Sequence, residues 1–245
     1  MKKWLALILP LIPLTIGIVS TFQNHYGFNR TVMLQIVCIA ITAGLLLWNR
    51  RDARWSDWLL PVAYLCCMGG DAFLFHRGDK EWMFIAGIAL FGLTHLSYFT
   101  LMISNGKLNR PVGAVVTGGL LIYFVVCLLP LPDMPLGLKI AVLIYLLLSC
   151  LTLSAATGLR LAKPEKTAFI AGVALMLFSD TTISFKEFLH WTPLNILLMP
   201  TYYYSLILMC TGMCLKLSHP AKPLPVLSLG MENAVDIRSS GDSAA

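Results

Sequence analysis

The segment YLCCMGGDAFLF, residues 64–75, places a carboxylate, Asp71, in the second half of an apolar run that is long enough to cross a membrane. A charged side chain inside a bilayer is costly, and it is retained where it faces a cavity or a partner. A second apolar run contains LFSDTTIS, residues 177–184, with Asp180 in a similar place. Our starting hypothesis is that these two acids meet in the folded chain.

The composition of the chain indicates an integral membrane protein. Of its 245 residues, 58% are hydrophobic and 12% are charged, whereas soluble domains average about 25% charged residues. The apolar runs are about 18–22 residues long, which is the length that a helix needs to cross the hydrocarbon layer. We predict an all-α protein with eight transmembrane helices in one bundle over residues 1–218, and a disordered tail over residues 219–245. The expected apolar segments are residues 4–22, 31–48, 57–75, 82–104, 111–129, 136–158, 167–188 and 196–216.

The basic residues predict the orientation of the bundle. If the N-terminus is cytoplasmic, 13 of the 18 Lys and Arg residues lie on the cytoplasmic side, and they alternate with the other side loop by loop. This positive-inside pattern predicts that both termini are cytoplasmic. The net charge of +6 is scattered over helix ends, so it favours contact with lipid head groups and gives no reason to expect nucleic acid. Compact loops and apolar cysteines favour a bacterial inner membrane.

Three ionisable residues are expected at similar depth in the membrane. Asp71 lies 14 residues after Asp57, and Asp180 lies 13 residues after Thr167, which is about 20 Å along each helix axis. His95 lies ten residues before Asn105, which follows its apolar run, or about 15 Å. We interpret the aspartates as candidate catalytic residues. Candidate substrate-binding residues are Gly70, His95, Tyr98, Ser179, Tyr202 and Tyr203.

The same residues have structural alternatives that the sequence leaves open. Either aspartate could bond a hydroxyl group of a neighbouring helix, and His95 and the tyrosines could be packing residues. Gly70 is also suited to a close approach between helices. The loop acids Asp57, Asp79 and Glu81 are expected to be solvated, and Lys186 and Glu187 are expected to be interfacial. The seven cysteines lie in apolar runs without accompanying histidines or acids, so we expect small buried side chains and no metal site.

Two carboxylates that share a poorly solvated pocket do not both ionise easily, so an acid is expected beside a base. That pair suits hydrolysis through an oxocarbenium-like cation, by analogy with glycosidases. One carboxyl group delivers the proton, and the other stabilises the cation or deprotonates water. We favour Asp180 as the acid and Asp71 as the base, although the sequence leaves the assignment open.

Three motifs in order resemble the YhhN family of lysoplasmalogenases. They are Gly70-Asp71 at the end of one apolar run, His95 and Tyr98 on the next, and Ser179-Asp180 on a later one. The resemblance extends over about residues 4–216 and includes the expected number of helices. Two positions depart from the family pattern: Arg30-Thr31 stands where a Lys-Pro is frequent, and Leu206 stands where a Gln is frequent.

The resemblance implies an ether hydrolase that cleaves the sn-1 vinyl-ether bond of lysoplasmalogens. The implied products are a fatty aldehyde and glycerophosphocholine or glycerophosphoethanolamine. The implied partners are the lysophospholipid substrate and membrane lipids, and no cofactor is implied; the oligomeric state stays open. The main alternative is a lipid or proton-coupled transporter that uses the aspartates as a proton relay. An intramembrane aspartyl protease is less favoured, because the chain has no Pro-Ala-Leu triplet.

Overall fold

The computed structural model describes residues 8–22, 28–51 and 53–218, and these form a helical bundle without an extended strand. The predicted tail at residues 219–245 lies outside the described residues. The helices are α2 (Leu11–Phe22), α3 (Phe28–Trp48), α4 (Leu59–His76), α5 (Glu81–Ser104), α6 (Arg110–Tyr123), α7 (Leu136–Thr157), α8 (Lys163–Leu189) and α9 (Asn195–Ser218). Two short elements complete the set, the 3₁₀ turn η1 (Trp55–Trp58) and the π-helical turn η2 (Phe124–Leu128).

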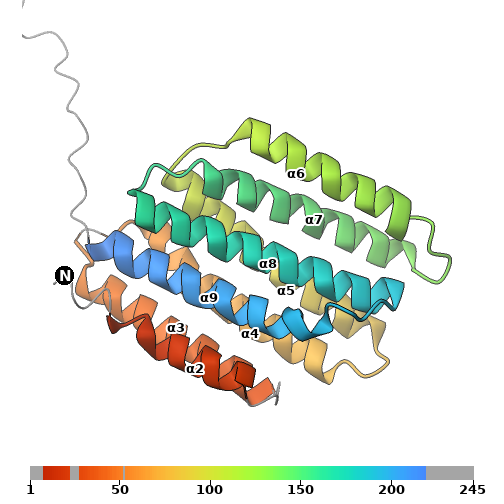
Figure 1. Ribbon diagram of the computed structural model, residues 1–245, viewed down its shortest axis with the longest axis horizontal. Helices are drawn as coiled ribbons and strands as arrows, with labels where there is room; N and C mark the ends of the chain where they lie inside the picture. The colour runs from red at the N-terminus through yellow and green to blue at the C-terminus, as the bar shows by residue number, and fades with distance from the viewer. Residues whose placement is uncertain (1–7, 23–27, 52, 219–245) are drawn as a thin grey trace, which may run out of the picture.

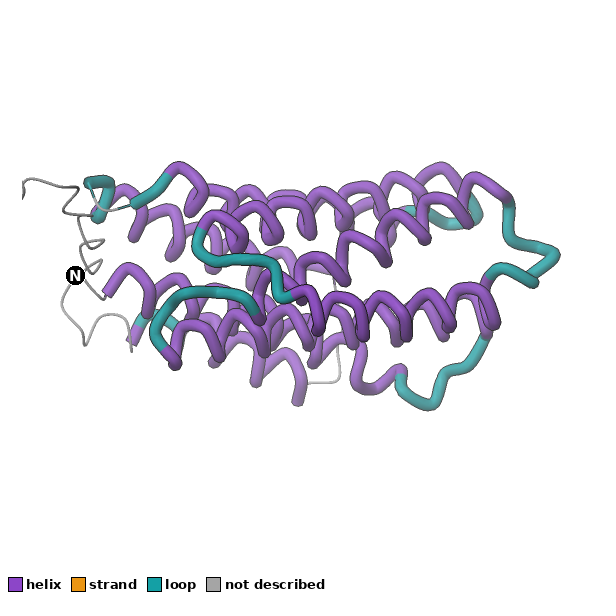
Figure 2. The backbone as a smooth tube through the Cα atoms, turned by 90° about the horizontal axis from the view of Figure 1, so that it is seen from above, coloured by secondary structure: helices purple, strands orange, loops and turns teal. Residues whose placement is uncertain are grey.

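The helices lie side by side with their axes nearly parallel, as two views at right angles show (Figure 1, Figure 2). The most extensive packing is between α8 and α9 and between α4 and α5. Helix α3 joins these pairs because it packs on both α4 and α9, and α7 joins them on the other side through α5 and α8. Helix α6 lies at the edge of the bundle, against α7.

Seven of the described helices are long and apolar enough to span a membrane. The first expected segment, residues 4–22, corresponds to α2, which has 12 residues, or about 18 Å of helix. This is shorter than a span, and residues 4–7 lie outside the described part of the chain. The structure therefore supports an all-α membrane bundle with seven spanning helices among the described residues, and the predicted orientation stays a prediction.

Some helix boundaries differ from those predicted. Helix α8 begins at Lys163 instead of residue 167, because Pro164 suits a first helical turn and the Glu165 carboxylate accepts the backbone N–H of Ala162 at 2.8 Å. The prolines after Leu129 end the preceding helix as predicted, and the last turn before them is η2.

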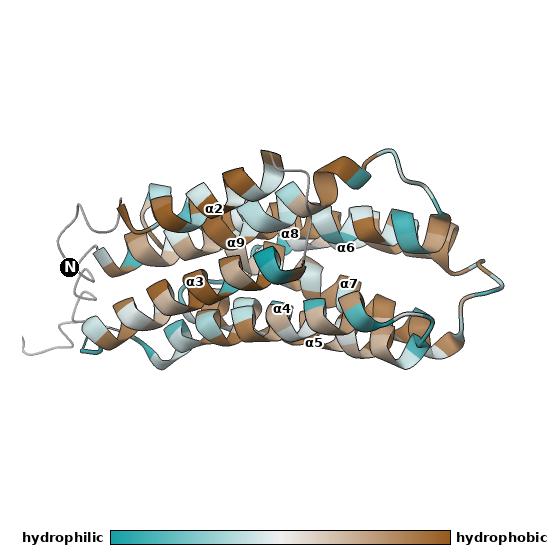
Figure 3. Ribbon diagram, turned by 90° about the horizontal axis from the view of Figure 1, so that it is seen from below, coloured by the Kyte–Doolittle hydropathy of each residue, from teal (hydrophilic) through white to brown (hydrophobic). Residues whose placement is uncertain are grey.

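The outer surface of the bundle is apolar. Large side chains such as Trp48 and Val115 are 80% and 76% exposed, and Figure 3 shows that hydrophobic residues occur along the length of the helices. A surface of this kind suits a lipid environment, since the backbone polar groups are paired within the helices. The centre of the core includes buried side chains of α3, α4, α5 and α9.

The prediction that Asp57 is a solvated loop acid is wrong. Its side chain is 1% exposed and forms an ion pair with Lys216 of α9. Its second oxygen accepts the backbone N–H of Arg54 at 3.1 Å, at the start of η1. The partner lies 159 residues away in the sequence, so local composition carried no sign of it. The ion pair connects η1, which directly precedes α4, to the end of α9.

The loop after α5 and the loop after α7 lie against each other at Gly158. The backbone N–H of Lys107 donates to the Gly158 carbonyl at 3.1 Å, and that of Arg160 donates to the Asn105 carbonyl at 3.0 Å. A Cβ at Gly158 would lie 1.7 Å from the Lys107 carbonyl oxygen. Only a residue without a side chain allows the two backbones to approach this closely.

We expect Gly158→Ala to destabilise the protein by about 1–3 kcal/mol, because the two loops must separate to admit a methyl group. The midpoint of thermal unfolding of the purified protein in detergent measures this. Gly118→Ala is the matched control, because a Cβ at Gly118 meets no atom within 4 Å and Ala is the better helix former. Equal midpoints for the two variants would contradict the close approach of the two loops at Gly158.

Lys216→Met should lower the free energy of unfolding by about 3–5 kcal/mol, because it leaves the Asp57 carboxylate buried without its cation. Adding Asp57→Asn, which retains an acceptor for the Arg54 N–H, should recover most of the loss. The same unfolding measurement on the two single variants and the double variant gives the coupling. Strictly additive losses would mean that the two side chains do not interact.

Candidate active site

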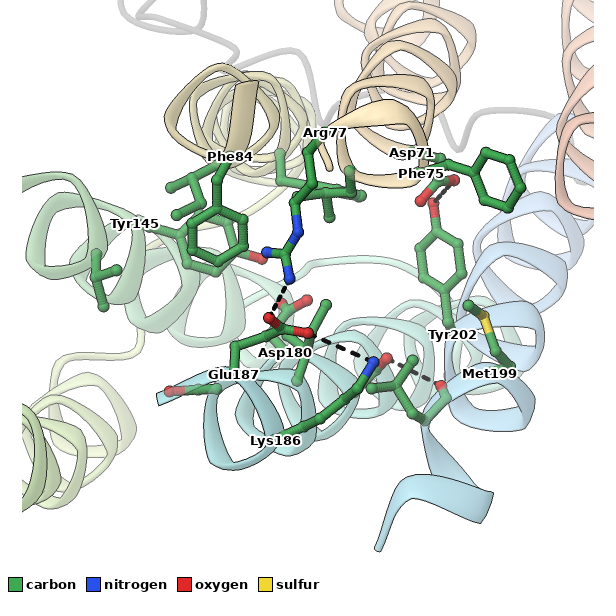
Figure 4. Close-up of a pocket in the computed structure, with 18 of the residues that line it drawn as sticks. Asp71, Phe75, Arg77, Phe84, Tyr145, Asp180, Lys186, Glu187, Met199 and Tyr202 are labelled. Carbon is green, nitrogen blue, oxygen red and sulfur yellow. Dashed lines mark hydrogen bonds and ion pairs between the residues drawn. The ribbon is translucent and has the colours of Figure 1, made fainter. Parts of the chain in front are cut away.

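A cavity of about 330 Å³ lies between the α4–α5 pair and the α8–α9 pair, and both Asp71 and Asp180 line it (Figure 4). Helices α4 and α8 run in the same direction, and they carry the two acids on opposite sides of the cavity. The cavity's apolar lining comes from six helices. The apolar lining residues are Phe28, Leu74, Phe75, Phe84, Ile88, Phe91, Val142, Leu146, Ile183, Phe188, Leu198 and Met199.

Asp71 belongs to a closed triangle of hydrogen bonds with Gln35 of α3 and Tyr202 of α9. The Gln35 amide nitrogen donates to Asp71 Oδ2 at 2.6 Å and to the Tyr202 hydroxyl at 2.9 Å, and that hydroxyl donates to the same Oδ2 at 2.8 Å. An amide has two N–H groups and a phenol can donate and accept at once, so all three bonds can form together. The triangle fixes Asp71 as an acceptor of two hydrogen bonds.

Asp180 is bonded to a different set of side chains. Its Oδ2 lies 3.3 Å from Nε2 of His95, and the Tyr145 hydroxyl of α7 lies 3.2 Å from the same nitrogen. His95 is fully buried, and its Nδ1 has no partner among the described residues. The tautomer with the proton on Nε2 therefore avoids a buried, unpaired N–H group. His95 therefore contacts Asp180 on the side away from the cavity, since Asp180 lines the cavity and His95 does not.

Charged side chains surround the mouth of the cavity, which lies at the end of the bundle where α4 and α8 finish. Arg77 forms an ion pair with Glu187, and Lys186 lies 3.4 Å from the other oxygen of the same carboxylate. All three line the cavity. The prediction that Lys186 and Glu187 are interfacial therefore omitted their position at its mouth. The cavity is polar at the mouth and at the two aspartates, and it is largely apolar between them.

The other residues proposed from the sequence lie in three positions. Ser179 and Tyr202 line the cavity, and the Ser179 hydroxyl donates to the Leu198 carbonyl at 3.0 Å. The Tyr203 hydroxyl is 2.9 Å from that of Thr31, which itself lines the cavity. Tyr98 is buried behind His95, with the two rings edge to face.

Gly70 lies outside the cavity lining and serves helix packing. A Cβ at this position would be 2.8 Å from the ring of Phe91, so the missing side chain allows α4 and α5 to approach closely. Phe91 in turn lines the cavity and lies edge to face with Tyr202, at 6.2 Å between ring centroids. Gly70 therefore shapes the wall next to Asp71 through its neighbour.

Sequence reasoning missed Gln35 and Tyr145, the partners of the two acidic sites. Gln35 is fully buried in the middle of α3, and an amide within an otherwise apolar span was a signal that could have identified it. Tyr145 carries no comparable signal, because a tyrosine in an apolar run is a common packing residue. Among the described residues, no group of three or more His, Cys, Asp or Glu side chains could hold a metal ion.

Comparison with protein families identifies one match: the model of the YhhN family matches residues 25–213. Searches among curated proteins and among solved structures gave no match. The matched range contains both aspartates, their hydrogen-bond partners and the charged mouth of the cavity. Since it covers most of the 245 residues, the chain belongs to the YhhN family.

Proposed function

We propose that this protein is a lysoplasmalogenase that hydrolyses the sn-1 vinyl-ether bond of lysoplasmalogens. The observation that supports this most is the pair of aspartates from α4 and α8 on one cavity with apolar walls and a charged mouth. A single-chain lipid has matching parts: an apolar chain, a reactive bond next to it and a charged head group. The products are a fatty aldehyde and glycerophosphocholine or glycerophosphoethanolamine.

The first chemical step is a proton transfer to carbon. Asp180 gives its proton to the vinyl β-carbon, and the electrons of the double bond form the new C–H bond. The ether oxygen shares its lone pair with the adjacent carbon, which gives an oxocarbenium ion. The carboxylate of Asp71 stabilises this cation electrostatically. Asp71 suits that role because its Oδ2 already accepts hydrogen bonds from Gln35 and Tyr202.

Water completes the reaction and returns both acids to their starting states. A water molecule that enters through the charged mouth adds to the cation and loses a proton to Asp71, forming a hemiacetal. Asp71 then protonates the glycerol oxygen as the C–O bond breaks, and Asp180 takes the proton of the hemiacetal hydroxyl. The net change is the addition of one water molecule, and each aspartate acts once as general acid and once as general base.

Asp71→Asn and Asp180→Asn should each lower the rate of aldehyde release from lysoplasmalogen by at least about 10²–10⁴-fold, because each removes one partner of the acid–base pair. Purified protein in detergent, with aldehyde measured directly, is the assay. Asp79→Asn, at an exposed acid in the α4–α5 turn, should keep full activity. Unfolding midpoints close to the unaltered protein show that the inactive variants are folded.

The same assay separates hydrolysis from transport, since a transporter releases no aldehyde. In D₂O the mechanism places one deuterium on carbon 2 of the aldehyde. Full activity in either Asn variant would remove that aspartate from the mechanism, and an absence of aldehyde from the unaltered protein would exclude the hydrolase.

Gln35→Leu and Tyr202→Phe should each lower kcat about tenfold with little change in KM, because each removes one hydrogen bond that holds Asp71. Tyr203→Phe is the matched control, since it removes a hydroxyl group from the same helix that lies 2.9 Å from that of Thr31. Steady-state kinetics on lysoplasmalogen distinguishes the two parameters. A tenfold loss in the control as well would indicate general disruption of α9 instead of a role at Asp71.

A further inference from the structure

Three charged residues form one group at the mouth of the cavity. Arg77 follows the last residue of α4, while Lys186 and Glu187 lie in the last turn of α8. Their side chains are 31%, 45% and 16% exposed, respectively, so they meet water while they also line the cavity. Figure 4 shows the Arg77 guanidinium directed towards Glu187 across the opening. The guanidinium also lies 4.6 Å from the centre of the Phe84 ring, which restricts its position.

The charges of this group do not cancel. One oxygen of Glu187 pairs with Arg77 and the other lies near Lys186, so a single carboxylate bridges two cations and a net charge of +1 remains. Arg has five N–H donors and Lys has three. Most of these donors are therefore free of Glu187. A small anion with a single negative charge would match both the charge and the unused donors.

The spacing of the mouth cations from the aspartates is the same on both helices. Arg77 lies six residues after Asp71, and Lys186 lies six residues after Asp180, which is about 9 Å along each axis. In an alkenyl lysophospholipid, seven bonds separate the phosphorus from the vinyl β-carbon. An extended chain advances about 1.2 Å per bond, so these bonds cover about 8 Å. A phosphate held at the mouth would place the vinyl ether at the level of the two carboxyl groups.

We propose that Arg77, Lys186 and Glu187 form the binding site for the phosphodiester of the substrate, an inference that rests on the proposed function. Arg77 and Lys186 donate hydrogen bonds to the phosphate oxygens. Glu187 is a positioning residue: it holds the two cations on either side of the opening and keeps their combined charge at +1. The site thus fixes the depth of the lipid, so that the vinyl ether meets Asp71 and Asp180.

The test is a binding experiment with two lipids that the protein does not hydrolyse. Both carry the same saturated ether-linked chain on glycerol, and one has a phosphocholine head group whereas the other has a free hydroxyl group. Dissociation constants are measured by isothermal titration of the purified full-length protein in an uncharged detergent. We expect Arg77→Gln and Lys186→Gln to weaken binding of the phosphocholine lipid about tenfold or more and to leave binding of the other lipid unchanged.

Lys80→Gln is the matched control, because it removes an exposed cation from the turn that follows Arg77 and does not line the cavity. It should change neither dissociation constant. Glu187→Gln raises the net charge of the group, so we expect it to tighten binding of the same lipid with a phosphomonoester, which carries a second negative charge. Unfolding midpoints identify any variant that fails to fold, and Lys186→Gln, at the most exposed of the three, then carries the test.

Two results would overturn the proposal. One is equal affinity of the unaltered protein for both lipids, and the other is an equal loss of affinity for both lipids in Arg77→Gln and Lys186→Gln. Because neither lipid is cleaved, the outcome does not depend on catalysis. Phosphate-dependent binding without aldehyde release from lysoplasmalogen would support the mouth site and reject the proposed hydrolysis. Aldehyde release without phosphate-dependent binding would do the reverse.

Discussion

The cost of placing a carboxylate in an apolar bundle governs the organisation of this protein. Asp71 is accommodated because Gln35 and Tyr202 both donate to its Oδ2, at 2.6 and 2.8 Å. These donors come from α3 and α9, two helices that pack on each other. A polar group buried without partners would cost several kcal/mol in such an environment. The hydrogen bonds of Asp71 and the packing of α3, α4 and α9 therefore depend on one another.

The second acid is supported by a separate set of helices. Asp180 of α8 meets His95 of α5, and His95 meets Tyr145 of α7. Thr152, about two helical turns after Tyr145 on α7, donates to the backbone carbonyl of His95 at 3.1 Å. Each aspartate is thus held by two other helices, and the two sets do not share a side chain. Changes in the hydrogen bonding of one carboxyl group need not disturb the other, which would suit the separate proton transfers that we propose for the two acids.

Apolar length was enough to predict most of the bundle from the sequence. Seven spans follow the expected segments closely, because a run of about 20 apolar residues has few alternatives to a helix. The depth estimate also placed Asp71 and Asp180 at one level, and the structure finds both on one cavity. That estimate needed only the rise per residue and the shared direction of α4 and α8.

Contacts between segments that are distant in the chain could not be predicted from the sequence. Asp57 resembled a solvated loop acid, and only folding brings Lys216 to it. Gln35 meets Asp71 across 36 residues and Tyr145 meets His95 across 50, and periodicity within one helix contains no information on such pairs. Lys186 and Glu187 were assigned to an interface because they end an apolar run. Their position at the mouth depends on Arg77, which comes from another helix.

The two acids and the two cations at the mouth of the cavity are carried by the same pair of helices. Helices α4 and α8 run in one direction, and each presents first an aspartate and then, six residues later, a cation. Lys186 lies within α8 and Arg77 directly follows α4, so a small tilt or shift of either helix moves its acid and its cation together. A site on loops would not keep the distance between acid and cation so closely. For the lysophospholipid substrate that we propose, a fixed distance between the two ends of the site would determine which bond reaches the acids.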